Sequence, residues 1–269
     1  MSLFICPLCR EALQQEPTRW CCARGHSFDV AREGYVNLLP VQHKNSREPG
    51  DALDSLQARR AFLEAGHYAP LRDALVAQAA LHAPRHALDV GCGEGWYTGA
   101  LATVAGTVVG LDIAKPAIRL AARRYPRITW LVGSGVSLPI ADGTVDVATS
   151  VFSQLYPNEL HRVLAPGGQA IVVTPAPDHL WALREGLFEE VRPHAPDKFL
   201  TGLDPLFDLR ERLEVRAPLR LGQDAIRQLV LMTPYAWKAK PARRAEVESR
   251  SELLTDAVFT LMCFARKDA

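Results

Sequence analysis

Cysteine and histidine residues near the amino terminus have the types and spacing that most directly indicate chemistry. Cys6 and Cys9 form a C-x2-C pair, and Cys22 and His26 form a C-x3-H pair after twelve intervening residues. Thiolates and imidazoles are preferred zinc ligands, and four of them in two pairs suit a closed tetrahedral site. We therefore expect zinc to be held by Cys6, Cys9, Cys22 and His26, with Cys21 as the competing candidate for the third position.

The distribution of the cysteines supports a metal site over a disulfide framework. Four of the six lie in the first 22 residues, whereas Cys92 and Cys263 lie alone far downstream. A disulfide framework normally spreads its cysteines through a small secreted chain. The first nine residues also lack the basic segment and long apolar run of an export signal. Free buried thiols beside a surface histidine remain the simpler alternative.

A glycine-rich segment forms the second group of interest. Gly91, Gly93 and Gly95 follow a short apolar run and precede a helical one, and Asp112 comes 21 residues after Gly91. Glycines let such a turn approach a ligand closely, and a helix amino terminus offers unpaired N–H groups. The G-x-G-x-G spacing differs from the G-x-G-x-x-G of dinucleotide sites, but Asp112 is placed to accept hydrogen bonds from ribose hydroxyls. A tight turn with a surface aspartate is the alternative for each feature alone.

The elements that must position these residues alternate along the chain. Apolar or β-branched runs predict strands over residues 87–90, 107–111, 128–132, 145–152 and 170–174. Helical patterns lie over residues 100–104, 114–125, 159–164 and 179–191. Such alternation predicts βαβ units and a mainly parallel sheet, an α/β fold, with residues 213–219 and 258–265 as a terminal hairpin at its edge. Upstream, we expect a linker over residues 41–51, a helix capped by Asp51 and ended by Gly66, and a second helix from Pro70 to His82.

Composition narrows the class of protein. The chain has 269 residues, 48% hydrophobic and 23% charged, which argues against a disordered, collagen-like or coiled-coil protein. The formal net charge of +1 means that contact with a nucleic acid must come from local patches. No run of 18 apolar residues is present, so we expect no membrane contact and a cytoplasmic enzyme.

Four segments together resemble the class I S-adenosylmethionine-dependent methyltransferases. They are the glycine loop, Asp112, the run Leu138–Asp146 and the run Val163–Gly168, within residues 87–173. The resemblance implies a Rossmann-like seven-stranded sheet with a reversed edge hairpin. It also implies that the methionine part of the cofactor lies on the Gly91–Gly95 loop, with Asp89 and Glu94 also binding cofactor. Asp112 would hold the ribose, and Asp142 or a near neighbour would lie by the adenine.

Other stretches resemble one family more closely. Residues 25–29, 31–40 and 57–68 look like the bacterial enzymes that methylate N1 of a guanine in a hairpin loop of 23S ribosomal RNA. This resemblance implies zinc ligation by Cys6, Cys9, Cys22 and His26. It also implies cofactor contacts at Tyr68, Gly93, Glu94 and His179. The partners would be 23S ribosomal RNA and a second copy of the chain, as a homodimer.

The resemblance divides the chain into three parts. Residues 1–40 would be a zinc-binding module that recognises RNA, residues 41–85 a linker with helices, and residues 86–269 the methyltransferase domain. The residue that accepts the guanine N1 proton is not identified. Trp237, with Lys238, Lys240, Arg243 and Arg244 close by in the sequence, suits stacking and phosphate contact or is simply a solvated face.

One segment departs from the family. Where the family shows a Tyr-Ala-Pro-Cys-like sequence, in the wall where the target base should sit, this chain has residues 152–157 (F-S-Q-L-Y-P). Two alternatives therefore stay open beside ribosomal RNA methylation. One is a methyltransferase of the same fold acting on another RNA or a small molecule. The other is a zinc-bearing RNA-binding protein without catalytic activity.

Overall fold

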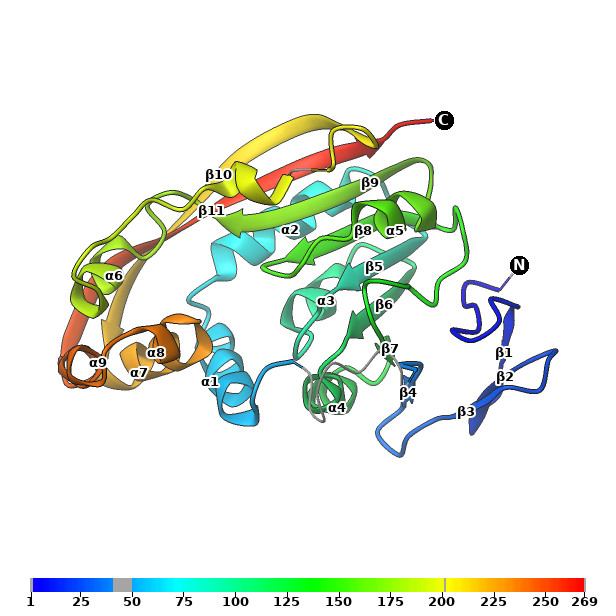
Figure 1. Cartoon of the computed structure of the whole chain (residues 1–269), viewed down its shortest axis with the longest axis horizontal. Helices are drawn as coiled ribbons and strands as arrows, with labels where there is room; N and C mark the ends of the chain where they lie inside the picture. The colour runs from blue at the N-terminus through cyan, green and yellow to red at the C-terminus, as the bar shows by residue number, and fades with distance from the viewer. Residues whose placement is uncertain (1, 41–49, 201, 269) are drawn as a thin grey trace.

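A single large sheet organises the chain in the computed structural model, which describes residues 2–40, 50–200 and 202–268. Its eight strands run in the order β10-β11-β9-β8-β5-β6-β7-β4 (Figure 1). Six are parallel: β4 (Tyr35–Asn37), β5 (His86–Val90), β6 (Thr107–Asp112), β7 (Thr129–Val132), β8 (Val145–Val151) and β9 (Leu164–Pro175). The last two, β11 (Glu252–Arg266) and β10 (Phe207–Gly222), are antiparallel to their neighbours. The α/β class and the reversed edge hairpin are confirmed.

Alternate residues of the strands bury their side chains in two different cores. In β9, for example, Ile171 and Val173 belong to one cluster of buried residues, and Ala170 and Val172 to the other. This division follows from the two-residue side-chain period of a strand. Because both faces of the central strands are covered, their sequences are almost continuously apolar, as parallel sheets require.

Helices that connect or follow the strands cover both faces of the sheet. The first cluster of buried residues draws on α2 (Ala69–Ala80), α3 (Trp96–Leu101) and α4 (Lys115–Arg124), and the second on α5 (Pro157–Val163). At the left of Figure 1, α1 (Leu53–Glu64) lies near α7 (Gln223–Met232), α8 (Tyr235–Lys238) and α9 (Pro241–Glu248). A short helix α6 (Trp181–Leu187) follows β9, and a 3-10 turn η2 spans Pro196–Leu200. No helix in these described ranges combines the length and apolar character needed to cross a bilayer.

The amino-terminal residues form a small three-stranded ribbon of β1 (Leu13–Gln15), β2 (Arg19–Cys22) and β3 (Ser27–Asp29). The ribbon is joined to the large sheet by contacts of several kinds. Phe4 forms a β-bridge with Ile140, and Phe4, Leu13 and Trp20 share a buried cluster with sheet residues such as Leu131. Beyond the ribbon, β4 pairs in parallel with β7. The sheet therefore has eight strands where seven were expected, because a segment of the expected zinc module supplies the additional edge strand.

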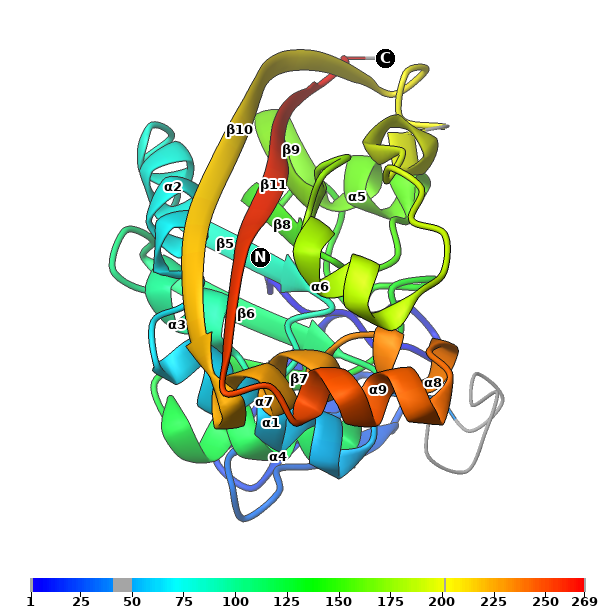
Figure 2. The same ribbon diagram turned by 90° about the vertical axis from the view of Figure 1, so that its left-hand side faces the viewer.

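Other local expectations differ from the structure in detail. The edge hairpin is far longer than expected, and β10 and β11 arch over the rest of the sheet in Figure 2. The helix expected over residues 100–104 begins earlier, at Trp96, directly after the left-handed Gly95. Asp51 does not cap the helix that follows it. The N-cap of α1 is Ala52, without a side-chain hydrogen bond, and Asp51 pairs instead with Arg59.

Candidate cofactor and metal sites

Most of the expected cofactor residues gather at the carboxyl ends of β5 and β6, and β8 is the neighbour of β5 on its other side. The connection after β5 leads to β6 on one side, whereas β8 continues to β9 on the other. Ligands of doubly wound sheets bind at such a switch point. We call this region, bounded by the Gly91–Gly95 loop, Asp112 and Ser153, the crevice. The two loops approach closely here, because a Cβ atom on Gly91 would lie only 2.4 Å from the Cβ atom of Ser153.

The glycine loop is tied to the end of β6 through Asp112. Its carboxylate accepts the backbone N–H of Gly93 at 2.9 Å and that of Ala114 at 2.7 Å. Gly93 itself has φ +56°, a conformation that glycine adopts at little cost. Burial raises the pKa of Asp112, while these two N–H donors favour its ionised form. Asp112 is therefore in position to order the loop.

Asp89 lies beneath the loop and is only 2% exposed. Its two carboxylate oxygens accept the hydroxyls of Thr98 at 2.6 Å and Thr149 at 2.8 Å. These bonds join β5 to the first turn of α3 and to β8. Burial raises the pKa of Asp89 to about 6. With both oxygens already engaged, Asp89 is placed to hold the loop in position from below.

Glu94 is buried in the loop with one oxygen unpaired. The residue is 5% exposed, and no described atom hydrogen-bonds to its Oε2. The nearest cation is Arg59 of α1, with Nη1 at 3.9 Å from that oxygen. Burial raises the pKa of Glu94, and the charge of Arg59 opposes this rise. A buried acceptor without a partner is costly, so Glu94 is poised to receive a donor from a ligand.

Tyr68 and His179 come from distant parts of the chain and meet in one aromatic cluster. Their ring centroids are 6.4 Å apart, and both rings pack against Phe259 of β11. His179 Nδ1 lies 2.8 Å from the carbonyl oxygen of Val258, so a neutral ring that donates from Nδ1 leaves Nε2 as an acceptor. Burial lowers the pKa of His179 to about 3, which keeps the imidazole neutral near pH 7.

Phe152 continues this aromatic cluster toward solvent. It follows β8, adopts φ +54° and leaves 44% of its surface exposed. A left-handed backbone is unfavourable for a bulky residue and is often found at functional sites. Its ring centroid lies 5.6 Å from that of Phe259. An exposed aromatic face thus stands beside the crevice, in the segment that departs from the family pattern.

Asp142 itself lies away from the glycine loop, so among the residues expected beside the adenine only a near neighbour of it stays a candidate. Asp142 precedes β8 and lies near its amino end, whereas the Gly91–Gly95 loop leaves the carboxyl end of the adjacent strand β5. Its carboxylate pairs with Arg162 at 2.6 Å and with Arg10 of the ribbon at 3.4 Å. Asp142 therefore helps to attach the ribbon to the sheet, at the edge opposite the crevice.

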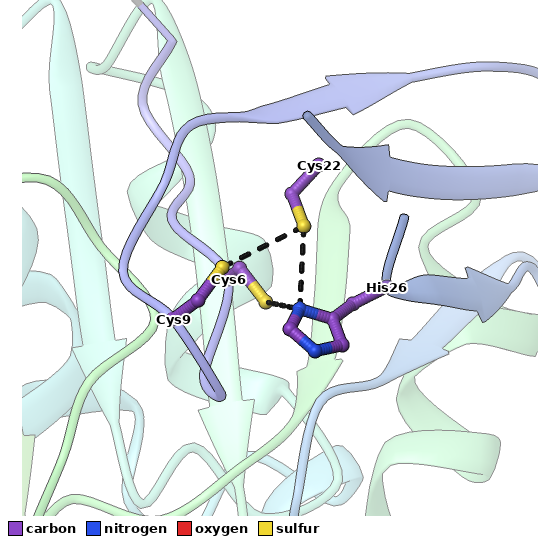
Figure 3. Close-up of side chains that lie close together, drawn as sticks. All are labelled: Cys6, Cys9, Cys22 and His26. Atoms are coloured by element: carbon purple, nitrogen blue, oxygen red, sulfur yellow. Dashed lines mark hydrogen bonds between the residues drawn. The ribbon is translucent and has the colours of Figure 1, made fainter. Parts of the chain in front are cut away.

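The four expected zinc ligands converge in the ribbon (Figure 3). Cys6 Sγ and Cys22 Sγ lie 3.5 and 3.4 Å from His26 Nδ1, and Cys9 Sγ lies 3.6 Å from Cys22 Sγ. Zinc bonds of 2.0–2.3 Å in a tetrahedron place ligand atoms roughly 3.3–3.8 Å apart. The donor set therefore fits zinc. Cys21 is outside the cluster, with its sulfur 3.7 Å from Glu16.

Sequence reasoning did not single out some residues that the structure places at the crevice. Arg59 reaches the glycine loop from α1, and Ser153 bridges the crevice by donating to the carbonyl of Val90 at 2.8 Å. Arg59 lies within the stretch that resembles the family, which was its only signal. Trp237, which the sequence did single out, is 64% exposed on α8, whereas nearby Lys240 pairs with Glu189.

Comparisons with known proteins agree with this geometry. Residues 4–47 match the zinc-ribbon family described as RlmA, N-terminal, and residues 87–168 match a methyltransferase domain family. The solved YcgJ protein of Bacillus subtilis has a TM-score of 0.52 at 15% identity, covering 74% of this chain and 98% of that one. YxjB of Bacillus subtilis is 32% identical over 90% of this chain and 89% of its own. The 23S rRNA (guanine(748)-N(1))-methyltransferase of Streptomyces fradiae is 37% identical over 95% of each chain.

Fold and crevice together define a class I S-adenosylmethionine-dependent methyltransferase with an amino-terminal zinc ribbon. Similarity over nearly the full length of both chains is more specific than a shared fold. The chain belongs to the family of 23S ribosomal RNA guanine-N1-methyltransferases.

Proposed function

We propose that this protein transfers a methyl group from S-adenosylmethionine to N1 of a guanine in a hairpin loop of 23S ribosomal RNA. The observation that carries the proposal is the position of Phe152. Its exposed ring stands at the carboxyl end of β8, beside the crevice formed by the Gly91–Gly95 loop and Asp112. Aromatic side chains stack on unpaired RNA bases, so a base resting on Phe152 would lie next to the cofactor.

The residues of the crevice act mainly by positioning. When bound, S-adenosylmethionine supplies an activated methyl group on a sulfonium. Asp112 would accept hydrogen bonds from the ribose hydroxyls, and Glu94 and the glycine loop would receive the methionine part. The rings of Tyr68 and His179 form an aromatic wall beside them. Orientation of two reactants in a closed site supplies a large part of a rate enhancement. A guanine in a loop reaches such a site without the opening of a full duplex.

The zinc ribbon recognises the surrounding RNA in this proposal. Cys6, Cys9, Cys22 and His26 would hold the metal, and the ion would stabilise a ribbon too small to form a large core of its own. The ribbon lies at the far side of the sheet from α8 and α9 (Figure 1). It would therefore contact RNA at a distance from the target base. Exposed Trp237 and Lys238 on α8 would contact the RNA at the other side.

The cellular setting follows from the substrate. We propose that the enzyme acts in the cytoplasm, and we include a homodimer in the proposal. The 16-residue strand β10 supports it, because β10 is the terminal strand of the sheet within the described ranges, and an unpaired strand edge is a surface on which a second chain can pair. Light scattering of the purified protein would give twice the mass of one chain. A mass equal to one chain at all concentrations tested would remove the dimer and leave the activity proposal intact.

Methylation of ribosomal RNA that lacks the modification tests the central proposal. With S-adenosylmethionine present, primer extension should stop at one guanine, because an N1-methyl group blocks base pairing. A transcript with adenine at that position is the matched control and should show no stop. If the enzyme leaves ribosomal RNA unmodified yet methylates transfer RNA or a small molecule, the substrate assignment is wrong. If it binds RNA but transfers no methyl group to any of them, the non-catalytic alternative replaces the proposal.

A further inference from the structure

We propose that Arg59 binds the α-carboxylate of the methionine part of S-adenosylmethionine, opposite Glu94, which binds the α-ammonium group. The inference rests on the proposed function in taking S-adenosylmethionine as the ligand of the crevice. It adds a residue from α1, outside the methyltransferase domain expected from the sequence, to the cofactor site.

The guanidinium of Arg59 lies directly over the glycine loop. A Cβ atom built on Gly93 would lie 3.5 Å from Arg59 Nη1, and Glu94 Oε2 lies 3.9 Å from the same nitrogen. Because 3.9 Å exceeds hydrogen-bonding distance, the two groups attract each other without a direct bond. Arg59 faces the loop that holds the amino-acid end of the ligand, and the side chain is 27% exposed.

The charges around this position match those of a zwitterion. Glu94 is buried, and its Oε2 has no hydrogen-bond partner among the residues that the structure describes, so it can accept a donor such as an ammonium group. Arg59 carries five N–H donors in a planar fork that suits a carboxylate. Its partner in the structure is Asp51, also a carboxylate. The guanidinium is thus already oriented toward the carboxylate of Asp51. The amino-acid end of the cofactor carries a second carboxylate, next to its ammonium group.

A rigid helix presents Arg59 to the loop. Leu56, Phe62 and Leu63 bury the apolar side of α1. Phe62 also packs edge-on against Tyr68, with ring centroids 5.2 Å apart, so α1 and the aromatic wall form one unit. A binding group on a packed helix keeps its position better than one on a loop. Helix α1 therefore supplies Arg59 from its middle turns and leads, beyond its carboxyl end, to Tyr68.

Calorimetry with two ligands tests this inference. S-adenosylmethionine is compared with its decarboxylated form, S-adenosyl-3-methylthiopropylamine, which lacks only the carboxylate. We expect Arg59→Gln to weaken binding of S-adenosylmethionine by about tenfold or more, as loss of a charge-assisted hydrogen bond does. Binding of the decarboxylated ligand should stay unchanged, so the preference of the wild-type protein for the carboxylate disappears. Arg59→Lys should retain part of that preference.

The control variant is Arg60→Gln, which removes the same charge from the next residue of α1. Arg60 pairs with Glu64 at 2.7 Å, and its loss should leave both affinities as in the wild type. If Arg59→Gln lowers the affinity for both ligands equally, α1 has been displaced and the inference is overturned. Unchanged affinity for both ligands would also overturn it. The measurement needs no RNA. If Arg59→Gln weakens binding of S-adenosylmethionine alone, the assignment of Arg59 is supported even where the protein methylates no RNA and the proposed substrate is wrong.

Discussion

The carboxylate of Asp112 accepts the backbone N–H of Gly93 at 2.9 Å, which joins the end of β6 to the loop after β5. One acidic side chain thus positions the loop, and it is the residue proposed to bind the ribose. The arrangement makes cofactor affinity depend on residues of two adjacent strands, and it leads to the first prediction.

Asp112→Asn should weaken S-adenosylmethionine binding by about tenfold or more, because a charge-assisted hydrogen bond contributes roughly 1.5–3 kcal/mol. Asp146→Asn is the matched control. Asp146 also accepts two backbone N–H groups, those of Arg85 and His86 at 2.9 Å, but at the opposite edge of the sheet. Calorimetry should show unchanged cofactor affinity in this control. A similar loss in both variants, or none in either, would contradict the ribose assignment.

Asp89 should make stability depend on pH in a defined direction. Burial raises its pKa from 3.8 to about 6, so the folded state holds the proton more tightly than the unfolded state. Its contribution is complete below about pH 4 and is lost as pH rises through 6. Relative to Asp89→Asn, the wild-type free energy of unfolding should fall by roughly 1–2 kcal/mol between pH 5 and pH 8. Urea unfolding of both proteins measures this, and a difference that stays constant or rises with pH would refute it.

The ribbon should bind one zinc ion per chain through Cys22 and not Cys21. Cys22→Ser should lose the metal and unfold the ribbon, since zinc contributes roughly 10–16 kcal/mol to the folding of comparable small modules. Cys21→Ser should retain it, because Cys21 lies by Glu16 outside the cluster. Elemental analysis of the two purified variants distinguishes these outcomes. Retention in Cys22→Ser with loss in Cys21→Ser would reverse the assignment.

Phe152→Ala should lower RNA methylation and leave cofactor affinity unchanged. Stacking of a base on an aromatic residue contributes roughly 1–3 kcal/mol, so kcat/KM for RNA should fall about tenfold. Phe152→Tyr keeps the ring and should retain most activity. Leu209→Ala removes another large exposed apolar side chain, on β10, and serves as the control. Wild-type activity in Phe152→Ala would show that the target base rests elsewhere.

Removal of the first 40 residues would be a poor test of the role of the ribbon. Those residues include β4, which pairs with β7, and Phe4 and Trp20, which are buried with residues of the large sheet. A truncated chain would expose β7 and part of that core to water. A single substitution at the metal cluster disturbs the ribbon but keeps β4 in the chain, and cofactor affinity then reports whether the crevice is intact.

Local pattern was sufficient for much of the site. The ligand pairs Cys6–Cys9 and Cys22–His26 and the glycine loop after β5 could be interpreted from neighbours in the chain, because each pair and the loop lie within one short segment. Strand positions followed in the same way from runs of apolar residues, since the periodicity of burial is a local property.

Packing between distant segments decided the rest. Only the folded chain brings Tyr68 beside His179, sets Arg59 over Gly93 and places Asp142 next to the ribbon. It also makes β4 part of the large sheet. These contacts depend on which buried surfaces fit together across the sheet. An apolar side chain in the sequence indicates that the residue will be buried. It does not indicate which residues it will contact, because the hydrophobic effect is non-directional. The contacts depend on how the shapes of all the elements pack together.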